Sequence, residues 1–285
     1  MKNDNTNLAS RQKNRASKSK SPVWRIGLTF LGVLLVASLA VNGYFIHNKM
    51  QAEQAAKHVY SHRGASGEEV EHTFSAYDLA IQYGSNYIEQ DLVTSKDGTL
   101  YVSHDLSAKK ITGVDKLYAD LTDQEIDALK TTSGEAILTL QSVFDRYGEQ
   151  VNYVIELKEN DQQTALFQEI VAKNNLKDKI IVQASSHEPL DKLEEVYPEM
   201  PKLLLVKKQE ELTAALANKN VDIISVNKSL MNEENVKLVH DKHKMFNAWT
   251  LDTTNEIKSA ITLGVDTYFT DFTAKALSLE AQFRK

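Results

Sequence analysis

The segment YIEQDLVTSKDGTLYVSHD, residues 87–105, carries the strongest fold signal in the chain. It begins with a strand-length apolar run over 87–93. Lys96-Asp97-Gly98 follows, and Asp-Gly between two β-prone runs is typical of a hairpin. We therefore predict that residues 99–103 form a strand returning beside the first, and that they open an insertion over about 99–135.

Outside this insertion, strand-length apolar runs alternate with amphipathic helical segments, which predicts parallel strands joined by right-handed crossovers. Eight such strands fit an α/β fold of the closed (β/α)8 TIM barrel type better than an open doubly wound sheet. No glycine-rich dinucleotide loop follows any of them, which argues further against the open sheet. The predicted strands are 58–62, 87–93, 153–158, 180–184, 203–206, 223–226, 247–251 and 267–270, with helices at 73–83, 162–174, 188–196, 210–218, 233–243 and 254–263.

The N-terminus has the pattern of a membrane anchor. Residues 1–25 are polar and basic, and residues 26–46 contain no charged side chain. A helix over 26–46 would be roughly 32 Å long, close to the thickness of the hydrocarbon core of a bilayer. Because basic flanks stay in the cytoplasm, we predict a cytoplasmic tail at 1–25, one transmembrane helix at 26–46, a linker at 47–57 and an extracytoplasmic barrel at 58–278. A cleavable signal peptide is the alternative, since Ser38-Leu39-Ala40 resembles a processing site.

Charge and composition exclude several classes of function. The tail at 1–25 holds seven of the 33 basic residues and one of the 39 acidic residues, so the rest of the chain carries a net charge of about −12. Such a domain repels polyanions, and we expect no nucleic-acid partner. The chain contains no cysteine, which excludes disulfides, zinc thiolate sites and thiol nucleophiles.

Ionisable side chains gather at the C-terminal ends of the predicted strands, where barrels of this type carry their chemistry. Side chains two residues apart on a strand share a face, so two of the pairs can each point into one space. The candidates are His62 and Arg63 after the first strand, Glu89 and Asp91 on the second, His104 after the hairpin strand, Glu156 and Lys158 on the third, and Trp249 on the seventh.

The carboxylates among these candidates predict a cation. Glu89, Asp91 and Glu156 would be costly to ionise side by side without one. With a divalent cation, Arg63, Lys158 and a bound phosphodiester, the charges of the site sum to zero. Oxygen ligands without cysteine favour Mg²⁺ or Ca²⁺ over zinc.

A set of short motifs runs through residues 58–275. It comprises His62-Arg63-Gly64, Glu71-His72-Thr73, Glu89-x-Asp91, His104-Asp105, Ile155-Glu156-Leu157-Lys158, Trp249-Thr250 and Thr270-Asp271. In order and spacing these motifs resemble the glycerophosphodiester phosphodiesterase family. The resemblance implies a metal-dependent hydrolase that cleaves glycerophosphodiesters to glycerol phosphate and an alcohol.

The resemblance also implies roles by matching position. His62 and His104 would be the acid/base pair, and Arg63 and Lys158 the phosphate contacts. The metal ligands would be Glu89, Asp91 and Glu156. Trp249 is predicted to form a pocket wall for the glycerol moiety. The family usually has Glu-Asn-Thr where this chain has Glu71-His72-Thr73, so His72 is either an altered substrate contact or a residue at a helix start.

Other functions stay open at this point. A glycoside hydrolase could use Glu89 and Glu156 as its carboxylate pair, but it would have no use for two histidines together with Arg63 and Lys158. A phospholipase D-like lipid phosphodiesterase shares much of the pattern, and a non-catalytic envelope binding protein is the third alternative. With the predicted anchor, we expect a glycerophosphodiester or a glycerol phosphate-containing envelope molecule as the substrate.

Overall fold

The structure is a computed structural model that describes residues 22–158 and 161–284, except the side chains of residues 22–30, 32, 33 and 161. The predicted cytoplasmic tail therefore lies almost wholly outside the described residues. Two units make up the chain, residues 1–49 and residues 50–285. Helix α1 (Pro22–Ala55) covers the predicted membrane span and most of the predicted linker at 47–57. The transmembrane prediction at 26–46 is not confirmed: judged on the described residues, the helices include none that is long and apolar enough to cross a bilayer.

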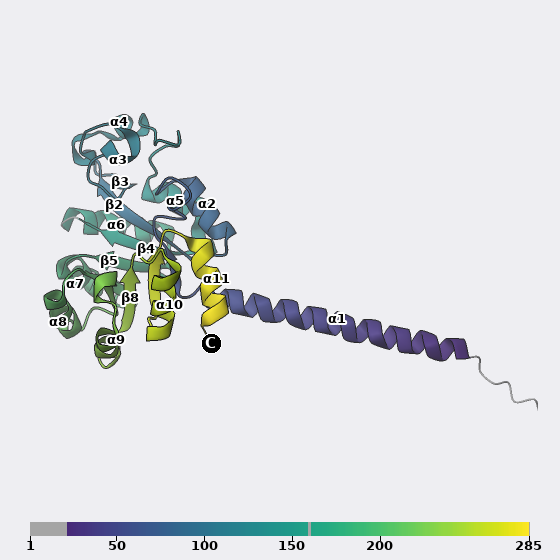
Figure 1. The fold of residues 1–285 in the computed structure, drawn as a ribbon. Helices are drawn as coiled ribbons and strands as arrows, with labels where there is room; N and C mark the ends of the chain where they lie inside the picture. The colour runs from purple at the N-terminus through teal and green to yellow at the C-terminus, as the bar shows by residue number, and fades with distance from the viewer. Residues whose placement is uncertain (1–21, 159–160, 285) are drawn as a thin grey trace, which may run out of the picture. The chain divides into compact units, whose positions relative to one another are not determined.

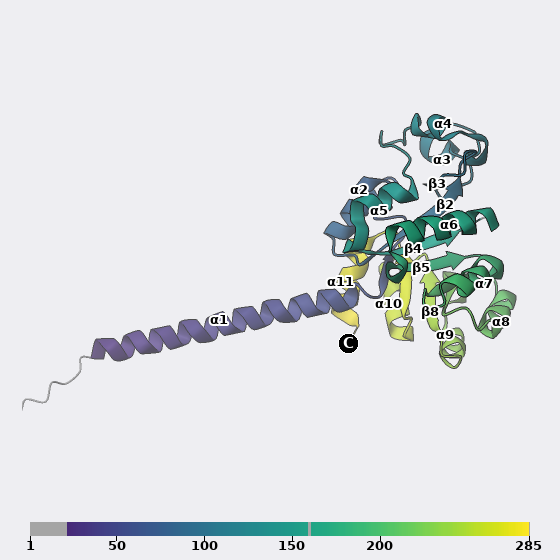
Figure 2. The same cartoon turned by 180° about the vertical axis from the view of Figure 1, so that it is seen from behind.

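The predicted (β/α)8 barrel is confirmed. In the described part of the chain, eight parallel strands close on themselves, because β1 pairs with both β9 and β2. The helices that connect them lie on the outside of the sheet in both views (Figures 1 and 2). The strands are β1 (Val59–Ser61), β2 (Tyr87–Thr94), β4 (Asn152–Leu157), β5 (Ile180–Ala184), β6 (Lys202–Val206), β7 (Ile223–Asn227), β8 (Met245–Trp249) and β9 (Thr267–Thr270).

The connecting helices start where the sequence supplies a capping side chain. Thr73 accepts a hydrogen bond from the backbone N–H of Ala76 at the start of α2, and Thr139, Asn232 and Thr253 do the same for α5, α9 and α10. The α-helices around the barrel are α2 (Phe74–Gln82), α5 (Leu140–Tyr147), α6 (Asp161–Asn174), α7 (His187–Val196), α8 (Gln209–Ala217), α9 (Glu233–His240), α10 (Thr254–Leu263) and α11 (Thr273–Phe283). Short 3-10 helices are η1 (Tyr118–Asp120), η2 (Gly148–Gln150), η3 (Lys177–Lys179) and η4 (Lys228–Leu230).

The hairpin insertion is present as predicted. Strand β3 (Leu100–Val102) pairs antiparallel with the C-terminal half of β2. Helices α3 (Lys109–Thr112) and α4 (Asp123–Asp127) follow, and Figure 1 shows them grouped with β3 at one end of the barrel domain. The insertion has a small core of its own, which includes Tyr101, Ile111, Tyr118 and Ile126. This core fixes the loop after β3, which carries His104.

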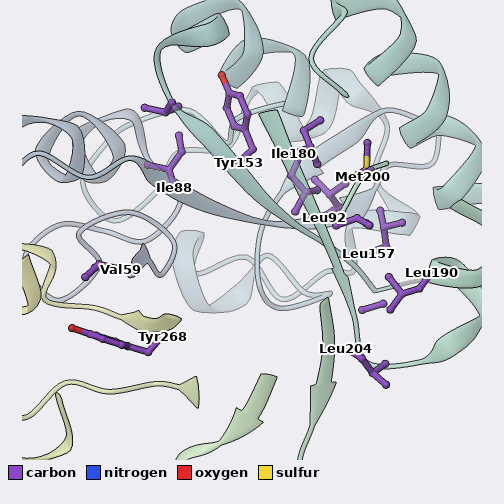
Figure 3. Packing of buried hydrophobic residues seen from close by; sticks show 14 of the residues in the cluster. Val59, Ile88, Leu92, Tyr153, Leu157, Ile180, Leu190, Met200, Leu204 and Tyr268 are labelled. Atoms are coloured by element: carbon purple, nitrogen blue, oxygen red, sulfur yellow. The ribbon is translucent and has the colours of Figure 1, made fainter. Parts of the chain in front are cut away.

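Two apolar layers hold the barrel strands in place. Between the sheet and the helices, Ile88 and Leu92 of β2 pack with Tyr153 and Leu157 of β4 (Figure 3). Because side chains alternate along a strand, Glu89 and Asp91 point to the opposite side, into the barrel. The interior is filled by a second cluster, comprising Tyr60, Val154, Ile181, Leu203, Ile223 and Phe269. Glu89 and Asp91 therefore lie next to the apolar interior cluster, at the C-terminal end of the barrel strands.

Candidate active site

The predicted site residues converge on one pocket at the C-terminal ends of the strands. Its volume is about 180 Å³. Seven of the eight predicted residues line it, and the eighth, Lys158, reaches one of these seven through its ammonium group. The lining residues are His62, Arg63, Glu89, Asp91, His104, Glu156, Gln183, Leu205, Lys207, Trp249, Thr250 and Phe269.

Strand register places the acidic groups side by side. Asp91 of β2 lies opposite Glu156 of β4, which in turn lies opposite Gln183 of β5. Glu89 precedes Asp91 by two residues and shares its face. The Gln183 amide Nε2 donates to Glu156 Oε2 at 3.1 Å and lies 3.4 Å from Glu89 Oε1. A neutral amide thus bridges the two carboxyl groups, and it supplies no positive charge that would favour their ionised form.

Burial and mutual repulsion control the protonation of these groups. Burial, with the nearby charge of Asp91 as the next cause, raises the pKa of Glu89 well above its usual range and that of Glu156 to about 8. Burial would also raise the pKa of Asp91. However, the hydrogen bond from His72 and the charge of Lys158 hold it well below its usual range. Among these three carboxyl groups, which form the carboxylate layer of the site, Asp91 is therefore the one favoured in the ionised form, whereas Glu89 and Glu156 hold their protons more tightly unless a cation joins them.

The donor set fits a hard divalent cation. Asp91 is 1% exposed, and its Oδ1 accepts no hydrogen bond from the residues that the structure describes, although Lys158 Nζ lies 3.1 Å away. A buried oxygen without a hydrogen bond, beside the carboxyl groups of Glu89 and Glu156, is the arrangement that oxygen-liganded Mg²⁺ or Ca²⁺ requires. The residues present therefore fit the cation that the sequence predicts.

Arg63 binds the carboxylate layer through both its backbone and its side chain. Its backbone N–H donates to Glu89 Oε2 at 2.8 Å, which its left-handed conformation (φ 56°) makes possible. The guanidinium donates to Glu71 at 3.1 Å, and its Nε lies 3.3 Å from Asp91 Oδ2. The Arg63 side chain is 12% exposed and lines the pocket. It is thus held by two carboxylates at the edge of the space that an anion would enter.

Lys158 connects β4 to the insertion. Its Nζ donates to the carbonyl oxygen of His104 at 2.6 Å and lies 3.1 Å from Asp91 Oδ1. The backbone N–H of Lys158 donates to Gln163 Oε1 at 2.8 Å. Lys158 therefore fixes the His104 loop against the carboxylate layer.

The two histidines are oriented in the same manner by neighbouring carboxylates. His62 Nδ1 lies 2.6 Å from Asp271 Oδ1, and His104 Nδ1 lies 2.8 Å from Asp105 Oδ1. An ionised carboxylate only accepts hydrogen bonds, so each Nδ1 carries the proton and each Nε2 is left as the reactive nitrogen. Burial lowers the pKa of His104.

Asp271 was not predicted as a site residue. Besides His62, it accepts a hydrogen bond from the Ser66 hydroxyl at 2.9 Å. Burial would raise its pKa, but the hydrogen bonds from His62 and Ser66 lower it. It lies 209 positions after His62, directly after β9, and the closure of β1 onto β9 brings the two together. The Thr270-Asp271 motif was the available signal, although it did not identify the partner.

The opposite side of the pocket is apolar. Trp249, Leu205 and Phe269 line it, and the Trp249 indole N–H donates to the carbonyl oxygen of Ser225 at 3.2 Å. Lys207, which the sequence did not predict, also lines the pocket and adds a positive charge to this otherwise apolar side. Trp249 thus lies where the prediction of a pocket wall requires it.

His72 has neither of the two positions expected for it. Thr73, not His72, caps helix α2, and His72 does not line the pocket. It is 2% exposed, with Nε2 lying 2.9 Å from Asp91 Oδ2 and Nδ1 lying 2.9 Å from the Tyr77 hydroxyl. Burial lowers its pKa to about 4.

Among the described residues, His72, Glu89 and Asp91 form a group of three possible metal-ligating side chains. Their ligand atoms lie within 4.8 Å of one another, and the group omits Glu156.

Comparisons with known proteins agree with this geometry. A glycerophosphodiester phosphodiesterase of Bacillus subtilis (strain 168) is 28% identical over 241 residues, which cover 74% of this chain and 82% of the relative. A Thermotoga maritima glycerophosphodiester phosphodiesterase structure superposes with a TM-score of 0.66 at 26% identity, covering 78% of this chain and 97% of the other.

A second similar structure is an Oleispira antarctica phosphodiesterase in complex with the product sn-glycerol-3-phosphate. It has a TM-score of 0.70 at 23% identity and covers 78% of this chain and 96% of the other, a likeness of fold. Residues 62–275 match the model of the glycerophosphoryl diester phosphodiesterase family. The sequence resemblance is thereby confirmed, and the chain belongs to this family of phosphoric diester hydrolases.

Proposed function

We propose that the pocket hydrolyses glycerophosphodiesters to glycerol phosphate and an alcohol, with one divalent cation and two histidines. The observation that carries this proposal is that two oriented imidazoles and three carboxyl groups line the same cavity. The family membership of residues 62–275 supports the reaction class. The residue roles rest on the geometry.

Glu89, Asp91 and Glu156 are the proposed ligands, and the oxygen donors favour Mg²⁺ or Ca²⁺. When bound, such an ion stabilises negative charge that develops on the phosphoryl oxygens. Arg63 and Lys158 supply positive charge on the same side of the pocket. A phosphodiester anion thus enters a locally neutralised site in a domain whose net charge is negative.

His62 and His104 divide the proton transfers. With Nδ1–H held by Asp271 or Asp105, each imidazole presents Nε2 to the cavity. One imidazole, neutral and unprotonated at Nε2, takes the proton of the attacking oxygen, which belongs to water or to the neighbouring glycerol hydroxyl. The other starts as an imidazolium and gives its Nε2 proton to the departing alkoxide. Trp249 and Phe269 cover the carbon atoms of the glycerol moiety.

The same proposal includes a location. The basic residues 1–25 and the uncharged residues 26–46 support a single-pass anchor in the cell membrane with the barrel outside the cytoplasm. Substrates at that location are glycerophosphodiesters or glycerol phosphate-containing molecules of the envelope. Protease added to intact spheroplasts tests the topology. We expect it to digest the barrel, whereas full protection of the barrel would contradict the proposal.

The reaction is tested by assaying the full-length chain in detergent on glycerophosphocholine, a lysophospholipid and polyglycerol phosphate, each with added Mg²⁺ or Ca²⁺ and with chelator. We expect metal-dependent release of glycerol phosphate from glycerophosphocholine or polyglycerol phosphate. Turnover of the lysophospholipid alone would favour the lipid phosphodiesterase. Binding of a substrate without turnover, with metal supplied, would favour the non-catalytic binding protein.

A further inference from the structure

We infer that His72 is a positioning residue for Asp91. Its hydrogen bond to Oδ2 fixes the orientation of the carboxylate, so that Oδ1 faces the cation. The inference rests on the proposed metal site and adds to it a residue that does not touch the pocket.

The hydrogen-bond pattern fixes the tautomer of His72. A neutral imidazole has one N–H, and Asp91 Oδ2 can only accept, so the proton is on Nε2. Nδ1 then accepts from the Tyr77 hydroxyl, 2.9 Å away. The Tyr77 hydroxyl can also donate to the carbonyl oxygen of Glu89 at 3.2 Å, and we assign its single proton to the shorter contact with His72. A relay therefore runs from Tyr77 through His72 to Asp91, and it uses both nitrogens of the imidazole.

This pattern indicates that His72 orients a ligand of the cation and does not bind the cation itself. His72, Glu89 and Asp91 have ligand atoms within 4.8 Å of one another, which by itself would allow His72 to bind the ion directly. However, a nitrogen that donates its proton to Asp91 has no lone pair for a metal, and the other nitrogen faces Tyr77. Carboxylates that ligate metals are themselves held by such outer partners, which orient them.

The two oxygens of Asp91 have different surroundings. Oδ2 accepts from His72, and Arg63 Nε lies 3.3 Å from it. Oδ1 is buried and accepts no hydrogen bond within the part of the chain that the structure describes, and its neighbour there is the Lys158 ammonium, 3.1 Å away. With Oδ2 occupied by His72, the carboxylate cannot rotate to exchange its oxygens without breaking a buried hydrogen bond. Asp91 is thereby prepared to bind an ion through Oδ1.

The backbone ties His72 to the phosphate side of the pocket as well. Its N–H donates to the carbonyl oxygen of Arg63 at 3.0 Å, and both residues have left-handed backbones, φ 59° at His72 and 56° at Arg63. A β-branched side chain would be strained in that conformation, whereas Asn tolerates it well. Asn and Gln are therefore the informative replacements for His72, since neither adds a charge or a branched Cβ.

The two replacements separate the two nitrogens. In His72→Gln the side-chain amide reaches about as far as imidazole Nε2 and can still donate to Asp91. In His72→Asn the shorter amide reaches only about as far as Nδ1 and can contact Tyr77 but not Asp91. Tyr77→Phe keeps both nitrogens of His72 and removes the hydroxyl that donates to Nδ1.

Binding of Mn²⁺ to the full-length chain, followed by the EPR signal of the free ion, tests the inference without depending on turnover. We expect His72→Asn to raise the Kd about 10–100-fold, His72→Gln to stay within about 3-fold of the unaltered chain, and Tyr77→Phe to lie between them. At saturating Mn²⁺ the kcat of His72→Asn should recover to within a few-fold of that of the unaltered chain, and KM should change little. The reason is that the altered side chain contacts no substrate and takes no part in the proton transfers. Circular dichroism melts control for folding.

Three results would overturn the inference. Equal weakening by Asn and Gln would show that the donor to Asp91 is irrelevant. A strong nitrogen coupling to bound Mn²⁺ in pulsed EPR, lost in His72→Asn, would make His72 a direct ligand. Absence of Mn²⁺ binding by the unaltered chain would remove the proposed metal site itself, a failure that is distinguishable from the first two.

Discussion

The two sides of the pocket differ in the chemistry that their strands supply. The side formed by β1, β2 and β4 carries Arg63, Glu89, Asp91 and Lys158, which are joined by ion pairs and hydrogen bonds. Glu156 is on the same side and is linked to Glu89 through the Gln183 amide. The side formed by β6, β8 and β9 carries Leu205, Trp249 and Phe269. The ionic side can hold charge that changes during a reaction, whereas Leu205, Trp249 and Phe269 can only exclude water and shape what binds. Lys207 adds one positive charge to the otherwise apolar side. Changes on the ionic side should therefore affect kcat and metal affinity, and changes on the apolar side should affect KM.

The largest effect is expected for Asp91→Asn. This replacement removes the carboxylate whose pKa is held well below its usual range and leaves a buried amide beside Arg63 and Lys158. We expect kcat/KM to fall about 10³-fold or more, because the loss of a cation ligand costs several kcal/mol of transition-state stabilisation. The measurement is glycerol phosphate release together with a metal titration. Asp266→Asn, at a carboxylate outside the pocket that pairs with His240, is the matched control and should leave both unchanged.

A smaller loss is expected for Asp271→Asn. The amide can still contact His62, but it no longer stabilises the tautomer with the proton on Nδ1. We expect kcat to fall about 10²-fold, which is the range of one acid/base contribution, while the Kd for metal stays the same. His62→Ala should reduce kcat at least as far, and His240→Ala is the control for removing a histidine. A Kd for metal that weakens along with kcat would mean that Asp271 belongs to the cation site.

The pH dependence of metal binding gives the next effect. The pKa of Glu156 is raised to about 8, so the ligand must lose a proton to bind a cation at neutral pH. Calorimetry in buffers of different ionisation enthalpy should show proton release, and the affinity should rise between pH 6 and 8 by about tenfold per pH unit for each ligand that loses a proton. A pH-independent affinity between pH 6 and 8 would contradict the assignment of Glu156.

The same raised pKa predicts how the metal-free protein responds to pH. A carboxyl whose folded pKa lies above its unfolded value of 4.5 contributes stability that is complete below pH 4.5 and is lost as pH rises through about 8. The melting temperature of the metal-free chain should thus fall between pH 5 and 8 relative to Glu156→Gln. Saturating cation should suppress this decline. Parallel melting curves for the two proteins would count against it.

The smallest effect is expected on the apolar side. Trp249→Leu removes an aromatic wall but no charge, and we expect KM to rise about 2–10-fold, in line with 0.5–1.5 kcal/mol for an aromatic contact. The Kd for metal should not change. Should kcat fall more than KM rises, the division of the pocket into an ionic side and an apolar side would need revision.

The sequence predicts the barrel well because the strands are short apolar runs, and the helical segments between them have apolar residues at helical spacing. The observed bounds of β5, β9 and α10 agree with the predicted ranges, and the Asp-Gly turn at Asp97-Gly98 locates the antiparallel β3. Strand position also predicts which ionisable side chains meet, since Glu89, Asp91 and Glu156 need only the alternation of side chains and parallel pairing. These features depend on local patterns repeated along the chain.

Features that depend on closure of the barrel are not visible in local patterns. The contact between His62 and Asp271 joins the two ends of the barrel, and no spacing rule indicates it. The direction of the His72 ring depends on its left-handed backbone, which a histidine seldom adopts, so the sequence allowed a helix-start role that Thr73 fulfils instead. The composition of the apolar stretch at 26–46 predicts a membrane span, and the anchoring of the chain in the cell membrane stays a proposal.

The most direct test of the central claim is an anomalous diffraction map of the barrel with Mn²⁺ bound. The account predicts a single strong peak in the pocket, about 2.2 Å from oxygens of Glu89, Asp91 and Glu156, with Asp91 contributing Oδ1 and the Nε2 atoms of His62 and His104 facing the space beside it. A peak coordinated by none of these three carboxylates, or a fully loaded crystal without a peak in this pocket, would contradict it.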